Sequence, residues 1–253
     1  MLKIENLTYI KNKKTILDNI NLELNNKQFI SLIGPNGSGK TTLLKAIQKK
    51  IKYNGNIIID KNAYVSYIND SYDFLSDIVY ENISFSLESL NYNNDEIEEK
   101  IKSLTNLFEV EDILYENVYR LNNYQKTIVH LISEIIYNPQ IILIDNAFIK
   151  LDNNEQNQIF KILKKYIITN NILLINTSNR PDDLLFSDKI LILNEGKIEM
   201  FEDTIKALEN EKTFTKCGLE LPFLVDLSIK LKYYNLVDKI YYNAKEMVNT
   251  LWK

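Results

Sequence analysis

Residues 1–33 alternate between hydrophobic and polar side chains. The alternation is clearest in LeuThrTyr at 7–9 and in IleAsnLeuGluLeu at 20–24, and polar turns separate the two stretches. This periodicity is typical of strands that bury one face. It predicts antiparallel strands at the start of the chain.

The hydrophobic period becomes helical further along the chain. A helical pattern at 41–50 follows the apolar run Phe29–Ile33, and residues 93–135 carry a longer helical pattern. The longer segment places its apolar side chains on one helical face, namely Ile97, Ile101, Leu104 and Phe108. An Asn/Asp start with Glu98 as the capping-box partner is expected, and the segment is predicted to be a helical insertion.

Short apolar runs typical of buried strands return in the second half, at 141–145, 172–176 and 189–193. Helical segments lie between them, which predicts an α/β fold with a mostly parallel sheet. The last fifty or so residues are predicted to be helical, with one helix at Thr204–Glu211, one with Pro222 in its first turn, and a short one at Ala244–Trp252.

Composition narrows the function classes. The 253 residues, of which 45% are hydrophobic, are enough for one large domain with insertions, and a net charge of −4 predicts no nucleic-acid partner. Cys217 is the single cysteine and His130 the single histidine, so neither an internal disulfide nor a His/Cys metal cluster is expected. The charged N-terminus and the lack of long apolar runs predict neither a signal peptide nor a membrane span.

A phosphate-binding motif lies between the strand at 29–33 and the helical pattern that follows it. The motif GxxxxGK[ST] is complete, and the loop with the residue after it comprises Gly34, Pro35, Asn36, Gly37, Ser38, Gly39, Lys40, Thr41 and Thr42. Glycine-rich turns at a helix N-terminus point backbone N–H groups at phosphate oxygens. Lys40 is therefore expected to bind the terminal phosphates of a nucleotide, and the Thr41 hydroxyl to bind Mg²⁺.

A second signal is IleIleLeuIleAsp at 141–145, an apolar strand that ends in a carboxylate. In proteins with this loop, an Asp at the end of a neighbouring buried strand orients Mg²⁺. Asp145 is therefore predicted to share the metal site with Thr41.

With these motifs in place, the chain resembles an ATP-binding subunit of an ABC transporter over essentially its whole length. The supporting stretches are 65–69, 78–83, 121–126, the pairs Asn138-Pro139 and Leu151-Asp152, and the hairpin at 188–198. The tail segments 217–223 and 244–252 are similar to the C-terminal extension of energy-coupling factor (CbiO-type) ATPases. The resemblance implies an ABC ATPase fold with an N-terminal antiparallel β subdomain. It also implies a nucleotide-binding domain at 1–203 with a helical subdomain near 86–138, and an extension at 204–253.

The same resemblance implies a mechanism and partners. Two ATPase subunits, identical or homologous, would hold two Mg-ATP between one chain's phosphate loop and the other chain's signature. A transmembrane coupling subunit and a substrate-binding membrane subunit would complete an importer for a vitamin or a metal ion such as cobalt or nickel. The chain would then lie at the cytoplasmic face of the membrane and contact it only through partners.

Several catalytic positions depart from the family pattern. Asn146 stands where a glutamate polarises water, and an amide accepts no proton. Counting nine residues back from Asp188 places Asn179 at the γ-phosphate histidine position. Asp70, or alternatively Asn69, stands at the Q-loop glutamine, and a carboxylate there is a possible Mg²⁺ ligand or proton acceptor.

The signature segment also departs from the pattern. Asn122 replaces the serine donor and Gln125 is retained, while side chains at Asn123 and Tyr124 are expected to hinder close approach to a phosphate. The adenine-stacking aromatic falls near Lys11, with Tyr9 two residues earlier. These changes predict Mg-ATP binding with slow hydrolysis.

Other functions stay open at this point. One is a nucleotide-binding structural or regulatory module that does not transport. A soluble ABC protein of DNA repair or translation, or a P-loop kinase, explains the motifs less completely.

Overall fold

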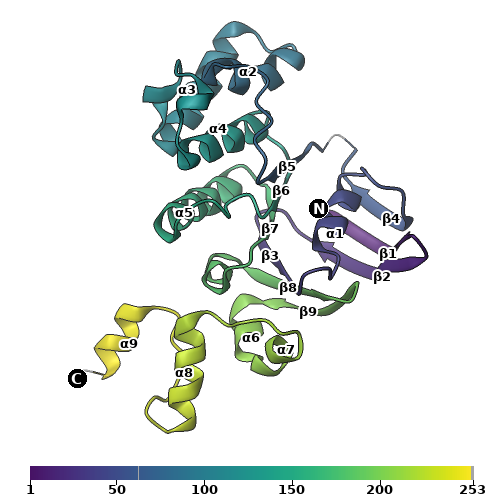
Figure 1. The fold of residues 1–253 in the computed structure, drawn as a ribbon, viewed down its shortest axis with the longest axis vertical. Helices are drawn as coiled ribbons and strands as arrows, with labels where there is room; N and C mark the ends of the chain where they lie inside the picture. Colours follow the sequence, from purple (N-terminus) through teal and green to yellow (C-terminus); the bar gives the residue numbers. More distant parts are fainter. Residues whose placement is uncertain (62, 252–253) are drawn as a thin grey trace.

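The computed structural model describes residues 1–61 and 63–251, and two β-sheets organise them (Figure 1). The smaller sheet is antiparallel in the order β2-β1-β4, with β1 at Leu2–Lys11, β2 at Lys14–Leu24 and β4 at Asn54–Ile59. The antiparallel start predicted from the sequence is thereby confirmed.

The larger sheet is parallel except at one edge. Its order is β5-β6-β7-β3-β8-β9, and only β9 runs antiparallel to its neighbour. The strands are β3 (Phe29–Ile33), β5 (Val65–Asn69), β6 (Ile141–Asp145), β7 (Leu173–Thr177), β8 (Lys189–Asn194) and β9 (Lys197–Asp203). The predicted mostly parallel sheet is confirmed.

Both faces of the larger sheet are covered, which explains why its strands are continuous apolar runs. Ile141 and Leu143 of β6 share a core with α1 (Lys40–Ile47) and the antiparallel sheet. Ile142 and Ile144 face the other way and pack with the helical insertion and α5. The carboxyl ends of the parallel strands are therefore held rigidly by two separate cores.

Helices α2 to α4 form the insertion at the top of Figure 1. They are α2 (Val79–Ser89), α3 (Asn94–Phe108) and α4 (Asn123–Ile135), with short 3-10 turns η1 (Glu111–Ile113) and η2 (Val118–Arg120). Helical structure thus begins before residue 93, the position at which the sequence pattern predicted the longer helical segment to start. The capping partner predicted for α3 was wrong, because Glu96 and not Glu98 closes the capping box with Asn93.

Helix α5 (Asn153–Thr169) is fixed to the larger sheet by an aromatic cluster around Phe160, which is 1% exposed. Its ring centroid lies 5.6 Å from that of Phe29, 5.4 Å from Phe148 and 5.3 Å from Phe186. Phe186 ends the turn η3 (Pro181–Phe186), which follows β7. The cluster therefore ties α5 to the segment between β7 and β8.

Replacing Phe160 with alanine is expected to lower the free energy of unfolding by about 3–5 kcal/mol, because the change removes a fully buried ring and leaves a cavity. Urea unfolding measures the loss. Tyr233→Ala is the control, since that ring is 77% exposed and its removal should cost within about 0.5 kcal/mol. Equal losses for the two variants would contradict the assignment of Phe160 to the core.

The C-terminal helices pack beside β8 and β9, where Ile190, Ile192 and Met200 join Phe214 and Val225 in a third core. The helices are α6 (Thr204–Glu209), α7 (Glu211–Lys216), α8 (Phe223–Tyr233) and α9 (Ala244–Leu251).

Two details of the predicted tail differ. The helix expected at Thr204–Glu211 breaks at Asn210, whose side chain caps α7. Pro222 is the residue just before α8 rather than in its first turn. Trp252, the expected end of the last helix, lies outside the described residues. Within the described residues, no helix has both the length and the apolar character needed to cross a bilayer.

Candidate functional site

The phosphate loop connects β3 to α1 and depends on its glycines. A Cβ at Gly34 would lie 1.9 Å from the carbonyl oxygen of Leu193, and the φ values of Gly34 and Gly39 are 154° and 107°. Only glycine fits such positions without strain. The loop therefore approaches β8 closely and leads into the N-terminus of α1. Backbone N–H groups at such a helix start are available to bind an anion.

Lys40 lies folded over this loop. Its Nζ donates to the carbonyl oxygens of Gly34 at 2.6 Å and Pro35 at 3.1 Å, and the residue is 9% exposed. Burial lowers the pKa of Lys40, and the nearby Asp145 carboxylate opposes that shift. A buried ammonium whose observed hydrogen-bond partners are neutral carbonyl oxygens suits a bound anion, which would stabilise its charged form.

Asp145 collects hydroxyl groups from three elements. Its Oδ1 accepts from Thr41 at 3.2 Å and from Thr177 at 3.0 Å, and its Oδ2 accepts from the Tyr67 hydroxyl at 2.7 Å. Thr41 and Asp145 thus meet as predicted, and hydroxyl and carboxylate oxygens are the ligands that Mg²⁺ prefers. Burial and the Asp145 carboxylate together raise the pKa of Tyr67, so this hydroxyl remains a donor at neutral pH.

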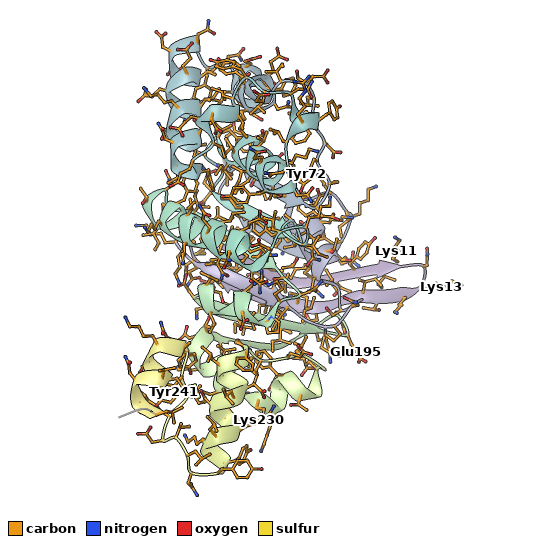
Figure 2. All side chains as sticks on the ribbon, turned by 60° about the vertical axis from the view of Figure 1, so that its left-hand side comes forward. Lys11, Lys13, Tyr72, Glu195, Lys230 and Tyr241 are labelled. Atoms are coloured by element: carbon orange, nitrogen blue, oxygen red, sulfur yellow. The ribbon has the colours of Figure 1, made fainter. Side chains whose placement is uncertain are left out.

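A groove of about 530 Å³ runs along the loop, within the size range of ligand pockets. Lys11, Lys14 and Lys45 line it together with Lys40, and Tyr9 lines it while packing against the core of the smaller sheet. Figure 2 shows Lys11 and Lys13 at the tip of the β1–β2 hairpin. Groove size, glycine cradle and clustered cations fit a nucleoside triphosphate with a divalent metal ion.

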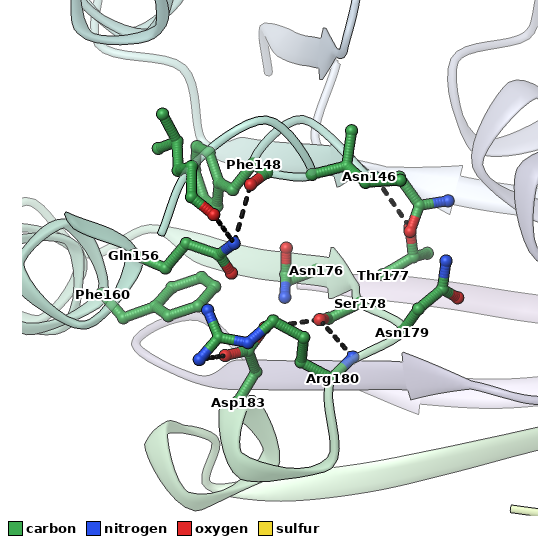
Figure 3. A pocket seen from close by; sticks show the side chains of 12 residues that line it. Asn146, Phe148, Gln156, Phe160, Asn176, Thr177, Ser178, Asn179, Arg180 and Asp183 are labelled. Carbon is green, nitrogen blue, oxygen red and sulfur yellow. Dashed lines mark hydrogen bonds and ion pairs between the residues drawn. The ribbon is translucent and has the colours of Figure 1, made fainter. Parts of the chain in front are cut away.

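Asn146 and Asn179 line one cavity of about 160 Å³ at the end of β6 and β7 (Figure 3). Asn146 has a φ of 53°, a left-handed conformation that asparagine tolerates well, and its backbone N–H donates to Thr177 at 3.0 Å. Asn179 also lines a second cavity, of about 280 Å³, with Gly34. The two residues singled out from the sequence are therefore brought together beside the phosphate loop.

Asp70 lies apart from this cavity. Asp70 is exposed, and its backbone oxygen accepts a hydrogen bond from Lys150 Nζ at 2.6 Å. The alternative, Asn69, is the strand partner of Asp145, and its side-chain oxygen accepts from the Ser71 N–H and hydroxyl. Of the two Q-loop candidates, Asn69 is the one in register with the metal-site carboxylate.

The signature segment forms the N-terminus of α4. Asn122 accepts from the Gln125 N–H at 2.8 Å, and Gln125 Oε1 accepts from the Asn122 N–H at 3.1 Å, so each caps the helix for the other. The ring of Tyr124 is partly buried and packs against the core of the helical insertion, and its effect on an approaching phosphate stays a prediction. Asn123 is exposed and remains at the helix start.

Comparison with known proteins decides the family. The model of the ABC transporter family matches residues 17–149. The chain belongs to the ABC transporter family. An energy-coupling factor transporter ATP-binding protein of Aster yellows witches'-broom phytoplasma (strain AYWB) is 31% identical over 252 residues, covering 94% of this chain and 90% of the relative. The resemblance to energy-coupling factor ATP-binding subunits is thereby confirmed.

Two solved structures share the fold of this ABC protein. CbiO1 from Clostridium perfringens, described as part of the ABC transporter complex cbiONQ, has a TM-score of 0.77 and 21% identity, covering 87% of this chain and 95% of that one. The ATP-binding cassette MJ0796, a dimer bound to ADP and Pi in a post-hydrolysis state, has a TM-score of 0.71 and 23% identity, covering 81% and 99%. The ABC ATPase fold expected from the sequence is confirmed.

Four residues of this ABC protein's site were missed at the sequence level. Tyr67 and Thr177 bind Asp145, while Ser178 and Asp183 form a hydroxyl–carboxylate hydrogen bond in the wall of the 160 Å³ cavity. Burial raises the pKa of Asp183, although Ser178 and the neighbouring Arg180 oppose that shift. Thr177 ends a strand just as Asp145 does, which was an available signal. The contact of Tyr67 with Asp145 depends on strand pairing, and Ser178 and Asp183 meet within the turn that follows β7.

The single histidine of this ABC protein packs within the helical insertion. Its ring meets that of Tyr72 edge-on at 6.2 Å, and burial lowers the pKa of His130 while Asp73 opposes the shift. The folded state thus resists protonation of His130. The contribution of this neutral side chain to the free energy of unfolding is complete above the His pKa of the unfolded chain, about 6.5, and is lost as the pH falls to the lower pKa of the folded chain.

Between about pH 7.5 and about pH 5.5, the free energy of unfolding is expected to fall less in His130→Gln than in the wild type. Glutamine does not titrate, so the variant lacks the loss that comes from protonating His130. Urea unfolding at the two pH values measures the difference. Glu134 and Asp183, whose pKa values are raised by burial, titrate in both proteins and cancel in the comparison. Parallel pH profiles would contradict the buried neutral state of His130.

Proposed function

We propose that this chain is the ATP-binding subunit of an energy-coupling factor importer. It binds Mg-ATP at its phosphate loop, closes against a second ATPase chain, and drives uptake of a vitamin or a metal ion through membrane partners. The observation that carries the proposal is the arrangement of Lys40, Thr41 and Asp145 around one intact loop.

Each group of the loop has a defined part in binding. Backbone N–H groups of the phosphate loop and of the start of α1 bind the phosphate oxygens, and Lys40 exchanges its carbonyl partners for the β- and γ-phosphates. Thr41 and Asp145 hold Mg²⁺, which neutralises phosphate charge when bound. Tyr67 and Thr177 keep the Asp145 carboxylate turned toward Thr41.

Hydrolysis at this loop is slow in our proposal, because Asn146 lies where a general base is needed. An amide accepts no proton, and loss of a positioned base costs about 10²- to 10⁴-fold in rate. Asn179 supplies an amide and no charge. Within the proposal, residues 1–203 bind the nucleotide and residues 204–253 form the C-terminal extension.

The partners follow from the relatives. The solved CbiO1 is described as part of a cbiONQ complex, which supports a transmembrane coupling subunit and a substrate-binding membrane subunit for this chain as well. The dimeric ATP-binding cassette supports a second ATPase chain, identical or homologous. The chain then lies at the cytoplasmic face of the membrane as a peripheral subunit.

The proposal is tested by recovering the tagged chain from detergent-solubilised native membranes with Mg-ATP present. Integral membrane proteins and a second ATPase chain should copurify in fixed proportion. Recovery as a soluble monomer under the same conditions would contradict transport and favour the other candidate, a regulatory module that uses ATP as a clamp.

A further inference from the structure

Arg180 lines two neighbouring cavities, one of which adjoins the phosphate loop at Gly34. It lines the 160 Å³ cavity with Asn146 and the 280 Å³ cavity with Gly34. Its backbone N–H donates to the Ser178 hydroxyl oxygen at 3.0 Å, which fixes the start of the side chain just beyond β7. A long flexible side chain anchored at this point has access to both spaces.

The guanidinium of Arg180 is incompletely bound. Its Nη2 lies 3.7 Å from Asp183 Oδ1, beyond hydrogen-bond distance, and its Nη1 is buried without a partner. Figure 3 shows the guanidinium beside Asp183, at the opposite end of the cavity from Asn146. A buried cationic donor without an acceptor is costly, so the observed arrangement favours a further anionic ligand.

Two neighbouring groups strengthen this reading of the cavity. Asn176 is 1% exposed, lines the same cavity, and its Nδ2 has no partner. Asp183 Oδ2 accepts the Ser178 hydroxyl, so the carboxylate keeps a hydrogen bond when Arg180 moves. The cavity thus offers two unpaired donors, while the one carboxylate in its lining keeps the Ser178 hydrogen bond at Oδ2 and has no hydrogen bond at Oδ1.

We propose that Arg180 recognises the terminal phosphate of bound ATP, its guanidinium leaving Asp183 to donate to the γ-phosphate that ADP lacks. The inference rests on the proposed function and names the group that distinguishes the two nucleotides. A planar guanidinium matches phosphate oxygens in a bidentate manner and carries the positive charge that Asn146 and Asn179 do not supply. An arginine in the same chain can stabilise the γ-phosphate in this way. Asp183 competes with the phosphate for the guanidinium.

The test measures the dissociation constants of Mg-ATP and Mg-ADP by displacement of a fluorescent nucleotide from the full chain. Arg180→Ala should weaken ATP binding about tenfold or more, with ADP changed less than about twofold. Arg180→Lys should lose an intermediate amount, because it retains the charge without the planar fork. Asp183→Asn should strengthen ATP binding and leave ADP unchanged, because Arg180 is then released from its competing carboxylate.

Arg120→Ala is the matched control, since the only other arginine is exposed in the helical insertion and should change neither constant. Arg180→Gln replaces the alanine variant if the latter fails to fold, with the same expected loss. Equal weakening of ATP and ADP, or no weakening of either, would overturn the role of Arg180. Wild-type chain that binds neither nucleotide would instead overturn the proposed function.

Discussion

Replacing Asn146 with glutamate should raise the ATPase rate of the chain by about 10²-fold or more, since it supplies the missing proton acceptor. The position is suitable, because Asn146 follows Asp145 at the end of β6 and lines the cavity shared with Asn179. The ATPase rate of this variant should rise with pH until the introduced carboxyl group is fully ionised. Phosphate release from the purified chain measures the rate.

The matched control for this gain is Asn146→Gln. The residue has a φ of 53°, and a longer side chain in that conformation costs about 1–2 kcal/mol whether or not it carries charge. Glutamine therefore repeats the size and the backbone strain of glutamate without the base. A similar rate for both variants would show that base loss at residue 146 does not limit hydrolysis.

Replacing Lys40 with alanine should weaken Mg-ATP binding by about 10- to 100-fold, because the change removes a charged donor to the phosphates. Lys40 is buried against the loop carbonyls of Gly34 and Pro35, so its ammonium group lies at the phosphate loop itself. Equilibrium binding of a fluorescent ATP analogue measures the effect.

Lys52→Ala is the control for Lys40, because Lys52 is exposed just after α1 and should leave ATP binding unchanged. Thermal unfolding of both variants checks that the loop still folds. ATP affinity of Lys40→Ala within about threefold of the wild type would contradict the assignment of the loop as the phosphate site.

Features encoded by neighbouring residues were predictable from the sequence. The phosphate loop is one contiguous motif whose glycines, lysine and threonine act locally, and the apolar run before Asp145 identifies a buried strand directly. The meeting of Thr41 with Asp145 was predictable because, in proteins with this loop, an Asp at the end of a neighbouring buried strand orients Mg²⁺.

Features that depend on long-range register were not predictable. Tyr67 reaches Asp145 only because β5 and β6 pair in register. The helix expected at Thr204–Glu211 divides at Asn210 because an asparagine side chain competes with the helix for backbone donors. The first contact depends on the pairing of strands far apart in the sequence, and the helix break depends on a side-chain cap that the apolar pattern does not reveal.

The central claim, that the chain holds Mg-ATP but hydrolyses it slowly, is tested most directly by a single-turnover measurement. Excess purified chain is mixed with radiolabelled ATP and Mg²⁺, and samples are quenched over time to follow the bound nucleotide. The account predicts that ATP stays bound and intact in the wild type, is cleaved in Asn146→Glu, and is not retained by Lys40→Ala. Rapid cleavage by the wild-type chain alone, abolished in Lys40→Ala, would contradict it.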